Sequence, residues 1–440
     1  MKVAIVGTGI SGSLVAALLH GAHDITVYEA EDRIGGHTHT HDLRDPSGAT
    51  VRVDTGFIVY NDWTYPNFIE LLQTLGVPTQ VSDMSFSVRC QATGFEYNGH
   101  TLNTLFAQRT NLLRPSFYGM VRDILRFNRE ARELLSTPDD GLTDHGPTLG
   151  EYLDRGRYGL AFMERYVLPM AGAIWSADAR SMREVPARWF VRFFENHGML
   201  SVDKRPTWRV VTGGSQRYHE ALRAPWADRI RTANPVTSIR RHADRVDIES
   251  SVDGGQSRRT ESYDQVVLAT HSDQALALLA DPSKHEREIL GAIPYQKNIA
   301  VLHTDDTIMP RRKLAWAAWN YHLGADRDGT CAVTYWMNKL QGLKTQQQYF
   351  VTLNDVDGID PAKTIKRLVY HHPVYRPQGV AAQARWSEIN GVQRTWYAGA
   401  WWGFGFHEDG VKSALAVADR FGRRIADLKA TQAKPALVHA

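Results

Sequence analysis

The feature that most constrains this chain is the spacing of Gly7, Gly9 and Gly12, which lie between an apolar run and a helical pattern. Residues 2–6 (KVAIV) and 24–28 (DITVY) read as strands, and the segment between them reads as a helix. In that order the glycines allow a tight turn, a close backbone approach to a diphosphate and close helix packing. The pattern predicts a strand–helix–strand unit that binds a dinucleotide; a purely structural glycine turn is the alternative.

An acidic residue and a second glycine pair indicate which dinucleotide is bound. Glu29 ends the second strand about 20 residues after the glycines, where a carboxylate accepts the ribose hydroxyls. The next residues, AEDRIGGHTHT, add a glycine pair that nicotinamide units do not need and that FAD enzymes place against the diphosphate and the ribityl chain. From this unit we expect cofactor contacts from Gly7, Gly9, Ser11, Gly12, Glu29, Ala30, Arg33, Gly35, Gly36, His37 and Thr38.

A hairpin is expected next, with its turn at residues 45–48 (DPSG). Its return strand would deliver Asp54 to the flavin side, followed by the predicted cofactor residues Gly56, Phe57 and Ile58. His37, His39 and His41 alternate and so share one face of a strand. No carboxylate or cysteine joins them at ligand spacing, so we predict no metal site.

Three later segments also carry patterns that predict contacts with the cofactor. Gly213 and Gly214 precede a helix, and the strands beyond them place Val236, Ala269 and Thr270 as backbone or apolar contacts on the adenine side. The alternative is that these are only strands of a three-stranded meander. Near the end, GAWWGFGFHEDGVKSAL opens a last helix whose N–H groups would point at the flavin, and it adds the predicted cofactor residues Gly399, Asp409, Gly410 and Val411.

The order of these segments predicts an α/β fold of two interleaved domains, since 440 residues exceed one compact core. A Rossmann-like FAD-binding domain would take residues 1–80, 205–285 and 390–428, and an α+β substrate domain would take 81–204 and 286–389. The first insertion is helical, and its clearest amphipathic helix is SFYGMVRDILRFNREARELL. The second mixes strands (IAVLHT, CAVTYWM, QYFVTL) with a helix near residues 361–369.

The composition further narrows the classes of protein to which this chain can belong. A net charge of +3 is too small to indicate a nucleic-acid partner. Two distant cysteines, Cys90 and Cys331, favour a reducing cytoplasm over a disulfide framework. No stretch reaches the roughly 20 apolar residues that span a bilayer.

These motifs resemble a known group. GTGISG, EAEDRIGG, VTGGS and the C-terminal run are similar to the flavin-containing amine oxidoreductase superfamily. The longer peptides VDTGFIVYNDWTYPNFIELLQTLGVPTQ, YVLPMAGAIWS, TYWMNKLQ and GFHEDGVKSAL resemble the FAD oxidoreductase segment fused ahead of the methyltransferase in plant cyclopropane-fatty-acid synthases, and its stand-alone bacterial relatives. This similarity covers about residues 1–425.

The resemblance implies non-covalent FAD and hydride transfer from a substrate C–H bond to flavin N5, with a methylated or cyclopropane fatty acyl chain of a lipid as the substrate. An amine oxidase acting on a polyamine or aromatic amine is one alternative. A non-catalytic flavoprotein partner of a fatty-acid methyltransferase is another. Related amine oxidases carry a lysine that holds a water against N5, and here Lys297 and Asn298 are both candidates because a slip of one residue exchanges their faces.

Two more expectations concern the base and the membrane. His407 is the candidate general base, since its ordinary pKa lies near neutrality, whereas Glu408 and Asp409 are typical helix caps. A basic amphipathic segment predicts peripheral contact with the inner membrane face, with a core helix bearing a solvated basic face as the alternative. Its cations and apolar residues are Arg109, Arg114, Arg122, Arg126, Arg129, Leu112, Leu113, Phe117, Met120, Ile124 and Leu125.

Overall fold

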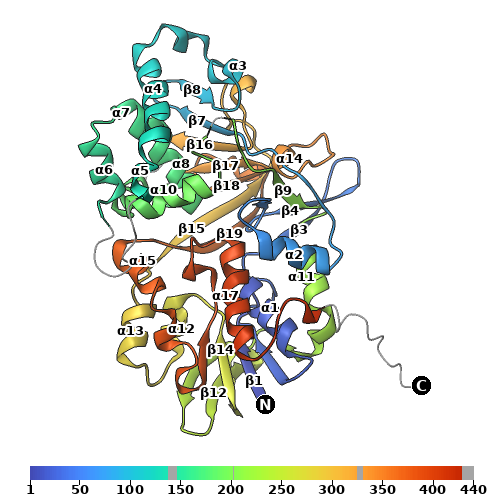
Figure 1. Cartoon of the computed structure of the whole chain (residues 1–440). Coiled ribbons are helices and arrows are strands. Elements are labelled where there is room, and N and C mark those ends of the chain that lie inside the picture. The colour runs from blue at the N-terminus through green and yellow to red at the C-terminus, as the bar shows by residue number, and fades with distance from the viewer. Residues whose placement is uncertain (137–145, 202, 325–330, 429–440) are drawn as a thin grey trace.

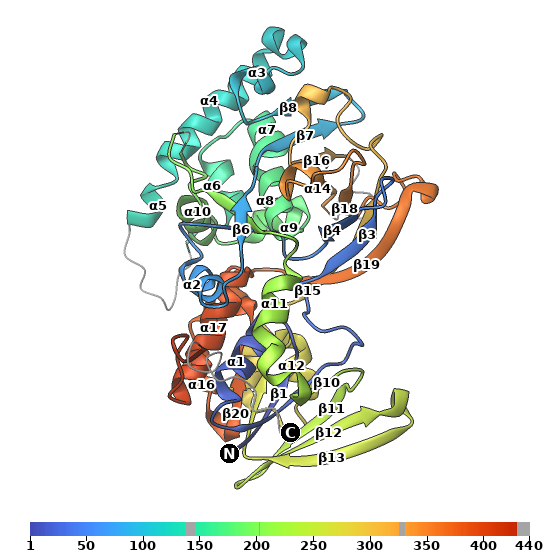
Figure 2. The same ribbon diagram turned by 90° about the vertical axis from the view of Figure 1, so that its right-hand side faces the viewer.

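The computed structural model describes residues 1–136, 146–201, 203–324 and 331–428 (Figures 1 and 2). A five-stranded parallel sheet forms the lower half, in the order β10 (Ile230–Arg231), β2 (Asp24–Tyr28), β1 (Lys2–Val6), β14 (Gln265–Leu268) and β20 (Thr395–Tyr397). Helices α1 (Ile10–Leu19) and α17 (His407–Arg420) pack together beside it. All its strands lie within residues 1–80, 205–285 and 390–428.

An antiparallel meander lies below this sheet, formed by β11 (Val236–Arg241), β12 (Val246–Val252) and β13 (Ser257–Tyr263) (Figure 2). Its inner residues Ile239 and Ile248 are fully buried and share a core cluster with Val6 and Leu268 of the parallel sheet. The meander alternative therefore describes the strand that begins at Val236, but not Ala269 and Thr270, which follow β14 of the parallel sheet.

A mixed seven-stranded sheet forms the upper half, in the order β19 (Thr364–Pro373), β15 (Tyr295–His303), β18 (Phe350–Leu353), β17 (Val333–Trp336), β16 (Trp319–Leu323), β7 (Phe86–Cys90) and β8 (Phe95–Asn98). The expected strands of the second insertion are present. The helix expected near residues 361–369 is wrong: Thr364–Pro373 is an edge strand that pairs antiparallel with β15 over its whole length. Its Thr, Ile, Val and Tyr residues suit a strand.

Helices of the first insertion gather beside the upper sheet (Figures 1 and 2). The expected amphipathic helix begins at Pro115 and ends at Glu130 as α4, and Glu133–Ser136 forms the separate α5. The neighbouring helices are α3 (Leu102–Leu105), η1 (Arg109–Leu113), α6 (Leu149–Arg155), α7 (Leu160–Phe162), α8 (Leu168–Trp175), α9 (Ala179–Glu184) and α10 (Ala187–Asn196).

The remaining elements lie within or between the two halves. The expected hairpin is formed by β3 (Thr40–Arg44) and β4 (Thr50–Asp54), and a small sheet has the order β5 (Val59–Asn61), β9 (Trp208–Val211) and β6 (Thr79–Val81). The other helices are α2 (Pro66–Thr74), α11 (Gln216–Arg223), α12 (Ser272–Leu278), α13 (Lys284–Leu290), α14 (Met337–Leu340), α15 (Pro377–Gln383) and α16 (Trp386–Ile389). Within the described ranges, no helix has the length and apolar character needed to cross a bilayer.

Candidate functional site

The turn between β1 and α1 leaves no room for side chains at two of its glycines. Gly7 has a φ of +103°, and a Cβ there would lie 2.8 Å from the carbonyl oxygen of Ala269. A Cβ on Gly12 would lie 2.0 Å from the carbonyl oxygen of Gly7. At Gly9, by contrast, a Cβ would meet nothing within 4 Å. The turn thus has the tight geometry that the glycine spacing predicts, with open space beside its middle glycine.

That open space lies at the start of α1, which carries no side-chain cap and no acidic residue in its first turn. The first amides of a helix have no partner within the helix itself. Together with the helix dipole they favour a negatively charged group. The start of α1 is therefore suited to the diphosphate of a dinucleotide.

Glu29 lies at the same turn. Its carboxylate accepts hydrogen bonds from the Thr8 amide (3.1 Å) and the Thr8 hydroxyl, and its other oxygen accepts the amide of Glu31 (3.0 Å). The amide of Asn234 donates to the Glu29 carbonyl (2.9 Å), which brings the start of β11 beside the acid. Ala30 is exposed, and Val236 is buried at the start of that strand. Their predicted adenine contacts stay predictions.

The loop with the second glycine pair, Gly35 and Gly36, contacts the first glycine turn. A Cβ on Gly36 would lie 3.2 Å from the Cα of Gly9, and the Gly35 amide donates to the Thr8 hydroxyl (3.1 Å). Arg33 holds this loop by donating to the carbonyls of Gly36 (2.9 Å) and Thr38 (3.4 Å). The two glycine turns therefore form one backbone-lined wall.

The segment after the hairpin continues that wall. A Cβ on Gly56 would lie 2.1 Å from the carbonyl oxygen of His37, and the Phe57 amide donates to the same oxygen (2.7 Å). The Phe57 ring stacks on the His407 ring with 3.4 Å between centroids, and Ile58 is buried. Gly56 is thus required for close backbone contact.

The C-terminal helix meets the start of α1. Ser11 Oγ donates to the Gly410 carbonyl (3.0 Å), and a Cβ on Gly410 would lie 2.8 Å from Ile10 Cγ2. Val411 is fully buried in the core that contains α1. Elsewhere in this segment, the Gly399 amide donates to Ser413 Oγ (2.9 Å), and Trp401 Nε1 donates to the carbonyl of Thr270 (3.2 Å). The chain end therefore closes on the N-terminal unit.

The two acids of α17 are engaged by the protein. Asp409 accepts the amides of Phe404 (3.0 Å) and Phe406 (3.1 Å). Glu408 accepts the side chain of Asn67 (2.6 Å) and the amide of Phe68 (2.9 Å) at the start of α2. Burial raises the pKa of Asp409 to about 6. Asp409 caps its own helix α17 through the amide of Phe406, as the sequence alternative describes, whereas Glu408 binds the first turn of another helix, α2.

His407 is buried and hydrogen-bonded within the protein, and its role as a general base stays a prediction. Its Nε2 is bonded to Tyr218 OH (2.8 Å) and Thr38 Oγ1 (3.2 Å), and the ring is buried on Phe57. Burial holds the pKa of His407 well below its usual range, so the ring is a poor proton acceptor. Its contacts instead join the second glycine loop to α11 and α17.

The register of β15 separates the two other catalytic candidates. Asn298 is fully buried; its Nδ2 donates to His372 Nδ1 (3.0 Å), and its Oδ1 accepts from Asn354 (2.8 Å). Lys297 lies on the opposite, exposed face of the strand. Lys297 therefore lies on the exposed face of β15 and Asn298 is the residue that points inward, and the contact of either with the flavin stays a prediction.

An imidazole cluster between the two large sheets was missed by sequence reasoning. The His37 ring lies 5.3 Å from His372, 6.2 Å from His271 and 5.1 Å from Tyr370, and His37 Nε2 is buried with no hydrogen-bond partner in the described protein. Burial lowers the pKa of His271 and of His372 to about 4. His271 lies in the short turn after the carboxyl end of β14, three residues beyond Leu268, where ligands bind in such sheets, so its position was a usable signal. His372 offered none.

The other two histidines of the alternating run have protein partners. His39 Nδ1 is bonded to Tyr370 OH (3.1 Å), and His41 Nε2 is bonded to Thr55 Oγ1 (3.0 Å). Across the described residues, no group of three or more His, Cys, Asp or Glu side chains is arranged to hold a metal ion.

The residues present fit FAD. The uncapped start of α1 and the open space at Gly9 suit the diphosphate, and the buried, unpartnered Nε2 of His37 offers a polar contact between the sheets. Gly36, Gly56 and Gly410 bring their backbones close to the same wall.

Comparison with known proteins gives the same assignment. The model of the family described as flavin containing amine oxidoreductase matches residues 10–318. Tryptophan 2-monooxygenase from Agrobacterium vitis is 48% identical over 54 residues, which are 12% of this chain and 7% of that protein. The same enzyme from Agrobacterium tumefaciens (strain Ach5) is 56% identical over 46 residues, 10% of this chain and 6% of that protein. These matches are short, so they say nothing about the whole protein's substrate.

Solved structures match over nearly the whole chain. Cyclohexylamine oxidase from Brevibacterium oxydans IH-35A superposes with a TM-score of 0.68 at 16% identity, covering 96% of this chain and 99% of that one. A CLA-producing fatty acid isomerase from P. acnes superposes with a TM-score of 0.66 at 17% identity, covering 95% and 98%. At these identities the likeness establishes the fold.

Proposed function

We propose that this chain, which belongs to the flavin containing amine oxidoreductase family and is an FAD-dependent oxidoreductase, dehydrogenates a methylated or cyclopropane fatty acyl chain of a lipid. The proposal rests on one observation, the uncharged lining of a small cleft next to the C-terminal motif, whose free volume of about 10 Å³ would have to widen to admit an acyl chain. The cleft is lined by Trp175, Ala177, Ser181, Met182, Val185, Trp189, Pro373, Val374 and Tyr375. None of these side chains carries a charge at neutral pH.

The cleft adjoins the candidate flavin site. Trp175 Nε1 donates to the Phe404 carbonyl (3.1 Å), and the Trp189 and Phe404 rings lie 4.9 Å apart. Phe404 in turn donates its amide to Asp409 in the first turn of α17. A substrate in the cleft would thus lie beside the segment that meets α1 at Gly410.

An apolar chain suits this lining better than an amine. A protonated amine needs a carboxylate or an aromatic cage; the cleft supplies no carboxylate, and its rings Trp175, Trp189 and Tyr375 are the feature that would favour the amine alternative. Asn298, and not Lys297, faces inward on β15, so the lysine implied by the amine-oxidase resemblance is missing from this position. The fatty acid isomerase with the same fold is a precedent for an acyl substrate on this architecture.

Bound FAD would supply the hydride acceptor. The rings of Trp175 and Trp189 lie 5.0 Å apart and pack on each other, so they would exclude water, and the acyl chain would be oriented against them. Tyr375 OH is buried without a hydrogen-bond partner in the described protein, and burial raises the pKa of Tyr375 well above its usual value. It therefore stays protonated and is available to donate to a substrate oxygen.

Anaerobic reduction of the bound flavin tests this proposal. Phospholipid with methylated or cyclopropane acyl chains should bleach the flavin absorbance, and polyamines or aromatic amines should not. Val185→Asp, which places a charge in the cleft, should abolish lipid bleaching while FAD content is retained. Val369→Asp, at an exposed position on β19, is the matched control. Bleaching by amines alone would establish the amine-oxidase alternative, and no bleaching by either class would favour a non-catalytic partner of a methyltransferase.

A further inference from the structure

Helix α4 carries apolar residues on two faces, and only one of them is used by the core. Phe117, Met120 and Phe127 are buried against the upper domain. On the opposite side, Tyr118 and Leu125 are 50% and 54% exposed. A helix whose outer face is also apolar presents more hydrophobic surface than its own fold requires.

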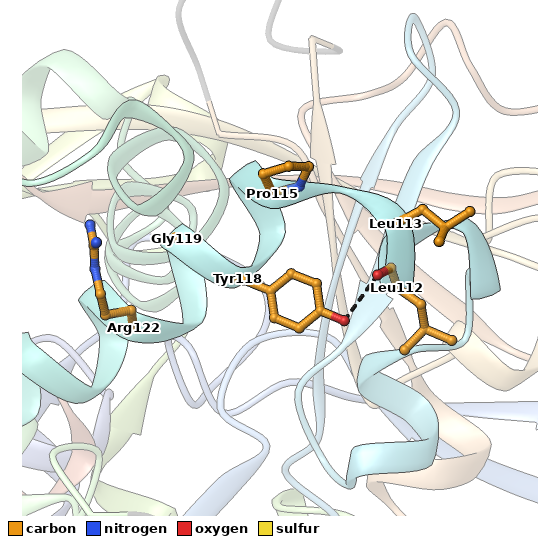
Figure 3. A pocket seen from close by; sticks show the side chains of 6 residues that line it. All are labelled: Leu112, Leu113, Pro115, Tyr118, Gly119 and Arg122. Atoms are coloured by element: carbon orange, nitrogen blue, oxygen red, sulfur yellow. Dashed lines mark hydrogen bonds between the residues drawn. The ribbon is translucent and has the colours of Figure 1, made fainter.

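The preceding elements extend this outer face. Leu113 is 86% exposed and Leu102 is 78% exposed, and Leu112 lies beside them in η1. Figure 3 shows Leu112, Leu113, Pro115 and Tyr118 around a shallow pocket at the corner between η1 and α4. Tyr118 OH donates to the Leu112 carbonyl (3.0 Å) and so fixes this corner. We call the face formed by α3, η1 and the start of α4 the apical face.

The apical face is also positively charged. From Gly99 to Arg122 the chain contains no aspartate or glutamate, while it contains Arg109, Arg114 and Arg122. Arg109 donates to the Asn103 side chain (2.7 Å) and Arg114 to that of Asn111 (3.2 Å), so these contacts leave their charges uncompensated. The Arg122 side chain is 79% exposed and lies 3.5 Å from the carboxylate of Asp123.

The combination of exposed leucines and arginines indicates which kind of partner binds the apical face. Exposed leucines that adjoin arginines match the boundary between the headgroups and acyl chains of an anionic bilayer. A second copy of the chain would set the same arginines against each other across a symmetric interface, which opposes self-association. Figures 1 and 2 show α3 and α4 at one extremity of the molecule, opposite the meander, so a planar surface can reach them.

We propose that the apical face docks on the headgroup region of an anionic phospholipid bilayer. Leu112 and Leu113 would insert below the headgroups, and Arg109, Arg114 and Arg122 would lie among the lipid phosphates. The contact is peripheral, and it holds whether or not the substrate is an acyl chain.

Flotation with vesicles tests this proposal on the FAD-bound, full-length protein. Vesicles of phosphatidylglycerol and phosphatidylcholine should carry the protein upward, vesicles of phosphatidylcholine alone should not, and added salt should release it. The double variant Arg109→Gln and Arg122→Gln should bind roughly thirtyfold more weakly. Leu113→Asp should also lower binding.

Matched controls lie in the half of the molecule that contains the five-stranded sheet and the meander. Arg258→Gln removes a cation that is 72% exposed on β13, and Val392→Asp charges an apolar residue that is 44% exposed before β20. Both should bind like the unaltered protein, and retained flavin absorbance verifies folding of every variant. The proposal is overturned if the unaltered protein stays unbound, if the apical variants and controls bind equally, or if Leu113→Asp disrupts a dimer instead.

Discussion

Two helices begin next to each other in the candidate site, and their first turns differ. α1 begins at Ile10 with no acid and no side-chain cap, and the space at Gly9 is open. α17 begins at His407, and its two acids bind backbone amides of the protein itself. The helices touch at Ser11 and Gly410.

The sequence predicts cofactor contacts at the first turns of both helices. The structure instead separates two tasks, binding an anionic ligand and joining protein segments. The start of α1 keeps its positive end available for an anionic ligand. The start of α17 ties protein segments together: Asp409 closes the turn at residues 404–406, and Glu408 caps α2 through Asn67 and Phe68. We therefore expect variants at α1 to change FAD affinity and variants at α17 to change stability.

The largest expected effect is that of Gly9→Asp. Gly9 has a φ of −62° and free space at its Cβ, so the folded chain accepts a side chain there. An aspartate would cap α1 and repel a diphosphate at about 4 Å, lowering FAD affinity by roughly a hundredfold to a thousandfold. Titration of the apoprotein with FAD measures this effect. Gly119→Ala, at an open helical position in α4, is the control; an unchanged FAD affinity in Gly9→Asp would contradict the assignment.

A smaller effect is expected from Glu408→Ala. This change leaves the amide of Phe68 and the side chain of Asn67 without their acceptor, and Glu408 is only 3% exposed. Buried donors left unpaired cost about 1–3 kcal/mol of unfolding free energy. Urea unfolding of the apoprotein measures it. Glu408→Gln, which keeps one acceptor oxygen, should recover part of the loss; equal stability of all three proteins would show that Glu408 is not a cap.

The smallest effect concerns pH and His407. Because the pKa of His407 lies well below 6.5 in the folded chain, the unfolded chain binds its proton more readily, and the stability that this ring contributes is lost as pH falls below about 6.5. The raised pKa values of Asp54 and Asp409 act in the opposite sense between about pH 4 and 6. His407→Gln should flatten the slope of unfolding free energy against pH by at most about 1.4 kcal/mol per pH unit. A slope identical to that of the unaltered protein would refute this reading.

Local spacing was enough to predict the lower half of the fold. The glycine turn, the acid after β2, the hairpin at residues 45–48 and the last helix depend on neighbours close in the chain, so the sequence reveals them. The strand at Thr364–Pro373 depends on pairing with β15, some 70 residues earlier in the chain, and local pattern alone suggested a helix. Tertiary pairing decided between the two.

The residues of the candidate site also fall into those that local sequence predicts and those that it does not. Gly9, Gly36 and Gly410 were predictable because each lies in a glycine motif readable from its neighbours in the chain, although Gly36 and Gly410 make their close contacts with the distant residues Gly9 and Ile10. The choice between Lys297 and Asn298 was not, because only the pairing of Asn298 with Tyr370 fixes which side chain faces inward. The cluster of His37, His271 and His372 joins three distant segments, so its convergence is visible only in three dimensions.

The central claim is that the start of α1 holds the FAD diphosphate while α17 is a structural anchor, and comparing two flavins tests it most directly. FAD carries the diphosphate and riboflavin lacks it, so binding of both to apoprotein should be measured for the unaltered chain, Gly9→Asp and Glu408→Gln. We expect Gly9→Asp to weaken FAD binding strongly and to leave riboflavin affinity nearly unchanged. We expect Glu408→Gln to change the affinities for the two flavins by similar factors. Equal weakening of both flavins by Gly9→Asp, or selective loss of FAD in Glu408→Gln, would contradict the account.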